Sequence, residues 1–153
     1  MKQSAYEAAV GLLSRRDHGE KELRSKLLSK GFAFEEVTDA LTRCKEYGYL
    51  DDSRYCELML RNGINKGWGP QRIQQSLKQK GIADSRIQEM FLDLDIDWFE
   101  QARVTAQRKF GSQVQRTKDR QVEMKEKAKR FRFLQYRGFD FEQSNYALEQ
   151  LSL

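Results

Sequence analysis

A short motif recurs three times along the chain, and this repetition constrains the possible folds more than any other feature. An apolar residue is followed four positions later by a glycine, which has a basic residue before it and an apolar residue after it; the copies occupy residues 27–32, 77–82 and 134–139. Glycine just past the end of a helix adopts a left-handed conformation, and the flanking apolar residues pack together across the cap. Each copy therefore predicts the end of one helix and a turn into another.

Two further helices accompany each copy. Apolar residues recur at helical spacing after each turn, as in Val37, Leu41 and Cys44. Before each copy stands another helix-like segment, and the residues expected to cap these three segments are Ser4, Asp52 and Asp97. Pro70 suits the first turn of its helix, because the N–H that proline lacks has no partner there.

We therefore predict an all-α fold of three tandem three-helix, helix-turn-helix-like repeats that form an elongated, curved molecule. The predicted repeats cover residues 1–50, 51–96 and 97–153. A unit of about 50 residues buries only a thin core, so neighbouring repeats are expected to share interfaces. The third repeat is longer, because Gly138 follows Gly81 by 57 positions whereas Gly81 follows Gly31 by 50. We expect the extra residues, 112–128, to lengthen a basic helix.

Positive charge is concentrated in the last third of the chain. Residues 101–153 hold 12 Lys/Arg against 6 Asp/Glu, whereas residues 1–50 hold 9 against 8 and residues 51–100 hold 7 against 9. Lys118, Lys125, Lys129 and Arg132 fall on one stripe of a helix, and Met124, Ala128 and Phe131 fall on a different arc. This division predicts a helix that packs on one side and presents a cationic ridge on another. The ridge is interpreted as a contact for DNA phosphates or an acidic protein surface, or else as a solvated face.

A tryptophan stands in a glycine-rich helix entry, Lys66-Gly67-Trp68-Gly69-Pro70. Its indole ring is suited to stacking on a base or anchoring a partner, and equally to covering the apolar edge between two repeats. Arg72 follows near the start of the next helix, where the helix dipole favours an anion.

Catalytic and metal-binding patterns are missing from the sequence. It has no phosphate-binding Gly-Lys-Ser/Thr loop, nucleophile elbow or zinc spacing, and the acidic residues from Asp93 to Glu100 lack the spacing of a calcium loop. The single histidine, His18, is interpreted as a capping or surface residue. Asp52, of the pair Asp51-Asp52, is interpreted as a helix cap, and the aromatic residues around the pair, Tyr47, Tyr49 and Tyr55, as packing that joins repeats. We expect a non-enzyme without cofactor or metal.

The remaining features favour a cytoplasmic protein. No stretch approaches the roughly 20 apolar residues of a membrane span, and the N-terminus lacks the apolar run of a signal peptide. Cys44 and Cys56 lie in helical patterns and are expected to be small buried residues in a reducing compartment. No feature demands self-association, so we expect a monomer.

Several segments together resemble the RecX family. The most recognisable is Gly48-Tyr49-Leu50-Asp51-Asp52-Ser53-Arg54-Tyr55, preceded by residues 16–23, which are similar to the family's first-repeat helix entry. Residues 66–70 with Ile73, Leu77 and residues 80–82 resemble its second repeat, and Phe133-Leu134 with residues 137–139 resembles its third. The order and spacing of these segments cover nearly the whole chain, although the third repeat matches mainly at its closing turn.

The resemblance implies a fold of tandem three-helix repeats. It also implies a regulator of recombination and DNA repair, including the SOS response, that binds along the groove of the RecA nucleoprotein filament and inhibits the recombinase, ATPase and coprotease activities of RecA. Single- or double-stranded DNA, in the context of the filament, is the implied second partner. The candidate residues for filament or DNA binding are Lys66, Trp68, Arg72, Arg108, Lys109, Arg116, Lys118, Arg120, Lys125, Lys129, Arg132 and Arg137.

Two other functions stay open at this point. Three-helix units also occur in helix-turn-helix transcription regulators that bind a duplex operator, but no helix here is conspicuously rich in base-reading Arg, Asn and Gln beside a tight turn. A helical-repeat scaffold without nucleic-acid contact is the second alternative, and salt-insensitive binding to a neutral partner would favour it.

Overall fold

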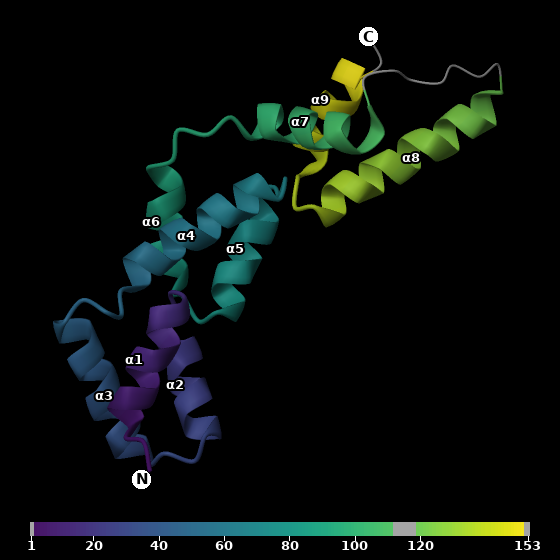
Figure 1. Cartoon of the computed structure of the whole chain (residues 1–153). Coiled ribbons are helices and arrows are strands. Elements are labelled where there is room, and N and C mark those ends of the chain that lie inside the picture. The colour runs from purple at the N-terminus through teal and green to yellow at the C-terminus, as the bar shows by residue number, and fades with distance from the viewer. Residues whose placement is uncertain (1, 112–118, 152–153) are drawn as a thin grey trace. The chain divides into compact units, whose positions relative to one another are not determined.

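The computed structural model describes residues 2–111 and 119–151. Within these ranges every regular element is an α-helix (Figure 1). The helices are α1 (Ala5–Arg15), α2 (Glu20–Ser29), α3 (Phe34–Glu46), α4 (Asp52–Asn65), α5 (Pro70–Gln79), α6 (Asp84–Leu92), α7 (Trp98–Phe110), α8 (Arg120–Tyr136) and α9 (Phe141–Leu151). The predicted all-α fold is confirmed.

The chain divides into two compact units. Unit 1 comprises Met1–Met59 and Leu77–Met90, and unit 2 comprises Leu60–Ser76 and Phe91–Leu153. The division runs through α4 and α5, so the second predicted repeat contributes residues to both units. The repeat boundaries expected from the sequence stay a prediction.

The apolar core of unit 1 is built by α1, α2 and α3. Its buried residues are Ala8, Ala9, Leu23, Leu27, Val37, Leu41, Cys44 and Leu50. Small alanines on α1 allow the helices to approach closely, and the larger side chains of α2 and α3 fill the space between them. Cys44 and Cys56 are both buried and free, as expected.

The three glycine turns form the predicted caps. Gly31, Gly81 and Gly138 have φ angles of +96°, +87° and +102°, the left-handed region that glycine enters without strain. In each turn the amide of the following apolar residue donates to the leucine carbonyl five positions earlier, as Phe139 does to Leu134 at 3.1 Å. This six-residue hydrogen bond is the Schellman pattern, so the repeated motif ends its helix as the sequence predicts.

Two of the three predicted N-caps are confirmed. The Ser4 hydroxyl accepts a hydrogen bond from the Glu7 amide at the start of α1. The Asp97 carboxylate accepts hydrogen bonds from Phe99 and Glu100 at the start of α7.

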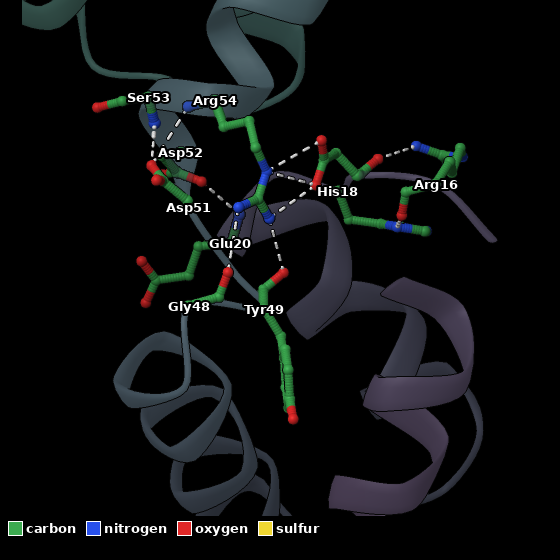
Figure 2. A network of polar contacts seen from close by, with 10 residues as sticks. Arg16, His18, Glu20, Gly48, Tyr49, Asp51, Asp52, Ser53 and Arg54 are labelled. Atoms are coloured by element: carbon green, nitrogen blue, oxygen red, sulfur yellow. Dashed lines mark hydrogen bonds and ion pairs between the residues drawn. The ribbon is translucent and has the colours of Figure 1, made fainter. Parts of the chain in front are cut away.

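The third predicted cap, Asp52 on its own helix, is wrong. Asp51 caps α4, because its Oδ1 accepts hydrogen bonds from the amides of Ser53 and Arg54 at 2.9 and 3.2 Å. Asp52 instead accepts from the amide of Glu20 at 2.9 Å and so caps α2, which lies 32 residues earlier (Figure 2). A local pattern cannot reveal this, because the donor belongs to a distant segment.

Unit 2 has its core between α7, α9 and the last turns of α8. The buried residues are Ala102, Ala106, Leu134, Phe139, Ala147, Leu148 and Leu151. Phe110 and Phe133 pack at its edge with their rings in a T-shaped pair, 5.3 Å between centroids. Arg130 stands eight residues before Gly138, where the other two repeats have the apolar residues Leu23 and Ile73. Its guanidinium lies 4.7 Å from the Phe110 ring centroid and pairs with Glu126.

The first part of α8 packs against nothing that the structure describes. Residues 120–129 are all exposed, including Val122 at 51% and Met124 at 65%. The prediction that Met124 and Ala128 form a packed face is therefore wrong, and only Phe131 and the residues after it contact the core. Figure 1 shows this part of α8 extending beyond α7 and α9. The helix is long, 17 residues against 10 in α2 and in α5.

A candidate cation–aromatic binding surface

The turn between α4 and α5 is fixed against other parts of unit 2. The Thr105 hydroxyl on α7 donates to the Gly67 carbonyl at 3.0 Å, and the Gly69 amide donates to the Arg137 carbonyl at 2.7 Å. A Cβ on Gly69 would lie 2.4 Å from the Gly138 carbonyl oxygen, so only glycine fits there. These contacts hold Trp68 in a defined position beside the turn that ends α8.

Around Trp68 the structure brings together three of the predicted candidates. The Lys66 ammonium lies 5.0 Å and the Arg72 guanidinium 4.3 Å from the centroid of the Trp68 ring. Arg72 also lies 4.9 Å from the ring centroid of Tyr136, whose backbone carbonyl accepts a 3.5 Å hydrogen bond from Arg72 Nη1. The Arg72 guanidinium therefore contacts two aromatic rings, those of Trp68 and Tyr136.

Tyr136 was not among the sequence candidates, although it is 74% exposed. At about 100° per residue, Lys125, Lys129, Arg132 and Tyr136 span about 60° of the circumference of α8. The sequence therefore places Tyr136 on the same helix face as the three cations, in an i, i+4, i+7, i+11 pattern. It was missed because the apolar tyrosine was not counted together with the basic stripe.

The predicted cationic ridge is present in its described part. Lys125, Lys129 and Arg132 are exposed and share their helix face with Tyr136. Arg116 and Lys118, two other predicted members of the surface, lie outside the described residues. We define the binding surface as Lys66, Trp68, Arg72, Lys125, Lys129, Arg132 and Tyr136.

The other candidates lie elsewhere on unit 2. Arg137 serves an internal role, since its Nη1 donates to the Lys66 carbonyl at 2.9 Å and its guanidinium lies over the Phe133 ring. Lys109, on α7, lies 5.7 Å from the same Phe133 ring. Arg108 and Arg120 are exposed, at the end of α7 and the start of α8.

A second polar network, in unit 1, holds α2 against the beginning of α4 (Figure 2). The Arg54 guanidinium binds both carboxylate oxygens of Asp17, with the shortest contact at 2.9 Å, and also donates to the carbonyls of Gly48 and Tyr49. The cap that Asp52 provides to Glu20 lies in the same network. These contacts connect the start of α2 to the start of α4, so the network has a structural and not a catalytic role.

Near this network lies a partly buried carboxylate, Glu22. It forms two hydrogen bonds with Arg16, at 2.8 and 3.2 Å, and an ion pair with Lys80 at 3.4 Å. Burial acts to raise the pKa of Glu22, but the hydrogen bonds and charge of Arg16, together with Lys80, outweigh it and lower that pKa to about 2. Burial and the charge of Glu22 raise the pKa of Tyr55 to about 12.

His18 is buried, with 2% of its surface exposed, so its interpretation as a surface residue is wrong. Its Nδ1 lies 3.0 Å from the Arg16 carbonyl oxygen and its Nε2 3.0 Å from the Lys26 ammonium. Burial lowers the pKa of His18, and the charges of Arg16 and Lys26 lower it further against the effect of the Arg16 carbonyl. The side chain is occupied by these contacts and has a structural role.

The described part of the chain holds neither a metal-ligand cluster nor a membrane-spanning helix. Residues 2–111 and 119–151 contain no group of three or more His, Cys, Asp or Glu side chains placed to hold a metal ion. In the same residues, no helix combines the length and the apolar character that crossing a membrane requires.

Family models of three-helix domains match most of the chain. The first three-helix domain of RecX matches residues 5–44, the second matches residues 51–90 and the third matches residues 95–148. The chain therefore contains the three tandem three-helix repeats that its sequence predicts.

Relatives and solved structures give the same result. The chain is 46% identical to the regulatory protein RecX of Vibrio vulnificus over 95% of its own length and 91% of that protein. It is 39% identical to the Cronobacter sakazakii protein of the same name over 92% and 90%. The fold resembles the crystal structure of RecX from Lactobacillus salivarius with a TM-score of 0.74, at 21% identity, over 97% of this chain and 94% of that one. The chain belongs to the RecX family of regulatory proteins.

Proposed function

We propose that this protein binds the RecA nucleoprotein filament in the cytoplasm and inhibits the recombinase, ATPase and coprotease activities of RecA. The observation that carries the proposal is the cation–aromatic surface on unit 2. The cationic ridge of α8 shares its helix face with Tyr136, and Arg72 lies against both Tyr136 and Trp68. Family membership supplies the partner, and the surface supplies a means of contacting the nucleic acid that the filament contains.

The ridge suits a phosphate backbone. Lys125, Lys129 and Arg132 are exposed cations on one face, and the three of them cover about 10 Å of helix axis at about 1.5 Å per residue. Phosphate contacts of this kind release counterions, so they favour binding strongly at low salt without reading sequence.

The aromatic end of the surface suits unpaired bases. The Tyr136 side chain is largely exposed, and the Arg72 guanidinium lies 4.9 Å from the centroid of its ring. The exposed ring is therefore available for a base to stack on. Stacking on an aromatic residue contributes about 1–3 kcal/mol per base and does not depend on base identity. Single-stranded DNA is therefore the form of DNA that we propose for this surface.

Inhibition would follow from binding alone. We propose no reaction on this chain, and any change in ATP turnover would arise in RecA. Several weak contacts made by one protein across neighbouring RecA protomers add through their effective concentration. A filament held in this way would exchange strands and hydrolyse ATP more slowly.

The test is ATP hydrolysis by purified RecA on single-stranded DNA, titrated with this protein well below one molecule per RecA monomer. The proposal expects strong inhibition and no hydrolysis by this protein by itself. Unchanged hydrolysis at every ratio, with folded protein, would contradict it and would favour a search for a duplex operator.

The Tyr136→Ala and Tyr136→Phe variants test the binding surface. Alanine removes the ring and should lower affinity for poly(dT) about fivefold or more, whereas phenylalanine keeps the ring and should bind as the unsubstituted protein does. Equal loss in both variants would mean that the hydroxyl, and not the ring, is required.

A further inference from the structure

Three tyrosines gather on unit 1. Tyr6 lies on α1, and Tyr47 and Tyr49 follow the end of α3. The ring centroids of Tyr6 and Tyr47 are 6.5 Å apart, and those of Tyr47 and Tyr49 are 5.8 Å apart. Tyr47 is 60% and Tyr49 46% exposed, so the prediction that they pack between repeats is wrong, whereas Tyr55 is buried as that prediction requires.

Tyr6 packs partly against the core of unit 1, but the fold does not need aromatic rings at positions 47 and 49. The turn after α3 is made by backbone groups, since the amides of Tyr49 and Leu50 both donate to the Cys44 carbonyl, at 2.8 and 3.1 Å. Gly48 supplies the left-handed residue, with φ +74°, and Leu50 supplies the buried side chain. Exposed tyrosines that the turn does not require are typical of interaction surfaces.

The backbone that carries two of these rings is held rigidly. Arg54 donates to the carbonyls of Gly48 and Tyr49 while its own charge is paired with Asp17. Figure 2 shows the Tyr49 side chain directed away from the Arg54 guanidinium. A surface already fixed before binding loses little conformational entropy when a partner arrives.

The charges around the tyrosines favour a protein partner. The Arg43 guanidinium lies 3.8 Å from the Tyr6 ring centroid, and no carboxylate among the described residues lies within ion-pair distance of it. The neighbouring Lys45 is already paired, with Glu20 at 2.7 Å. One uncompensated cation among phenol groups suits a single carboxylate beside apolar side chains, whereas a phosphate backbone is bound by several cations.

We infer that Tyr6, Arg43, Tyr47 and Tyr49, here named the tyrosine patch, bind a protein surface that presents an acidic side chain next to apolar ones. This inference rests on the proposed function, because the partner it assigns is the RecA protein of the filament. The patch contacts protein, and the cation–aromatic surface of unit 2 contacts DNA.

The experiment compares two probes: RecA filaments formed on poly(dT) with a slowly hydrolysed ATP analogue, and bare poly(dT) of the same length. The test variant is Tyr47→Ala combined with Tyr49→Ala, in the full chain. The matched control is Phe34→Ala, at the other end of α3. Phe34 is 63% exposed, much as Tyr47 is, and its ring also contacts an arginine, Arg24. Circular dichroism and thermal unfolding establish that each variant is folded.

The patch variant should bind filaments at least about tenfold more weakly and bind bare poly(dT) unchanged, because aromatic anchors carry much of the binding energy of protein interfaces. Phe34→Ala should change neither. Filament binding that is equal in the patch variant and the unsubstituted protein overturns the inference alone. Absence of filament binding by the unsubstituted protein overturns the proposed function as well, and a parallel loss on bare poly(dT) would assign the patch to nucleic acid and overturn the inference.

Discussion

The Nζ of Lys26 lies 3.0 Å from Nε2 of His18, and a lysine ammonium can only donate in such a contact. Nε2 must therefore accept, which makes the imidazole neutral, with its proton on Nδ1 facing the Arg16 carbonyl oxygen. Protonation would lose this hydrogen bond and place a buried positive charge beside Lys26.

Acidification should therefore destabilise the protein through His18. Its pKa is lowered in the folded state, chiefly by burial, so the unfolded chain binds the proton more readily. The contribution of His18 is fully present above its unfolded pKa of about 6.5 and is lost as the pH falls toward the folded value. Urea unfolding measured between pH 7 and pH 5 should show this decline. In His18→Gln the decline over this range should be smaller, and an unchanged slope would contradict the assignment.

Removal of the Glu22 carboxylate should cost about 1–3 kcal/mol of unfolding free energy at pH 7, because Arg16 and Lys80 lose their partly buried partner. Since the pKa of Glu22 is lowered to about 2, the difference between the protein and Glu22→Gln should shrink as the pH falls from about 4.3 toward 2. Chemical unfolding at several pH values measures it. Glu57→Gln, an exposed carboxylate on α4, is the control and should change stability little.

Gly69→Ala and Gly11→Ala should change stability in opposite directions. At position 69 the new methyl group would meet the backbone of Gly138, which cannot rotate away, so we expect a loss of about 1–3 kcal/mol. At position 11 nothing lies within 4 Å, and alanine in a helix should gain about 0.5–1 kcal/mol. Thermal unfolding of both variants is sufficient, and a neutral Gly69→Ala would contradict the close approach of the two turns.

Lys129→Glu and Lys127→Glu change charge equally but lie on different faces of α8. At about 100° per residue, Lys127 is on the side opposite the ridge, and both side chains are exposed. Lys129→Glu should weaken binding to poly(dT) and reduce the slope of log affinity against log salt by about 0.7 for the lost phosphate contact. Lys127→Glu should have the smaller effect on both. Equal effects would mean that overall charge, and not the ridge, governs binding.

The sequence predicts well those features that depend on neighbouring residues. The glycine turns, the Ser4 and Asp97 caps and the position of Pro70 at the start of α5 depend on a few residues whose geometry is local. The repeated motif extends these local rules to the whole chain, which is why the fold class follows from it.

Features that depend on distant residues were missed. Asp52 caps α2 and not its own helix, since its carboxylate accepts the hydrogen bond of the Glu20 amide, 32 residues earlier in the chain. Met124 has apolar spacing with Phe131, yet nothing in the described residues covers it. The burial of His18 does not follow from its place at a helix entry in the sequence. Of the candidate surface, the sequence predicts the basic residues and Trp68, and the structure adds Tyr136.

The contacts of unit 1 also determine how the gene can be divided for expression. A recombinant fragment that stops at residue 50 lacks Asp52, which caps α2, Arg54, which neutralises Asp17, and Lys80, which reaches Glu22. Such a fragment would keep every residue of its apolar core, but α2 would lose the Asp52 cap, Asp17 would lose Arg54, and Glu22 would keep only its pairing with Arg16. The smallest piece that preserves these contacts must extend beyond α5, so the first repeat is a unit of sequence but not a unit of folding.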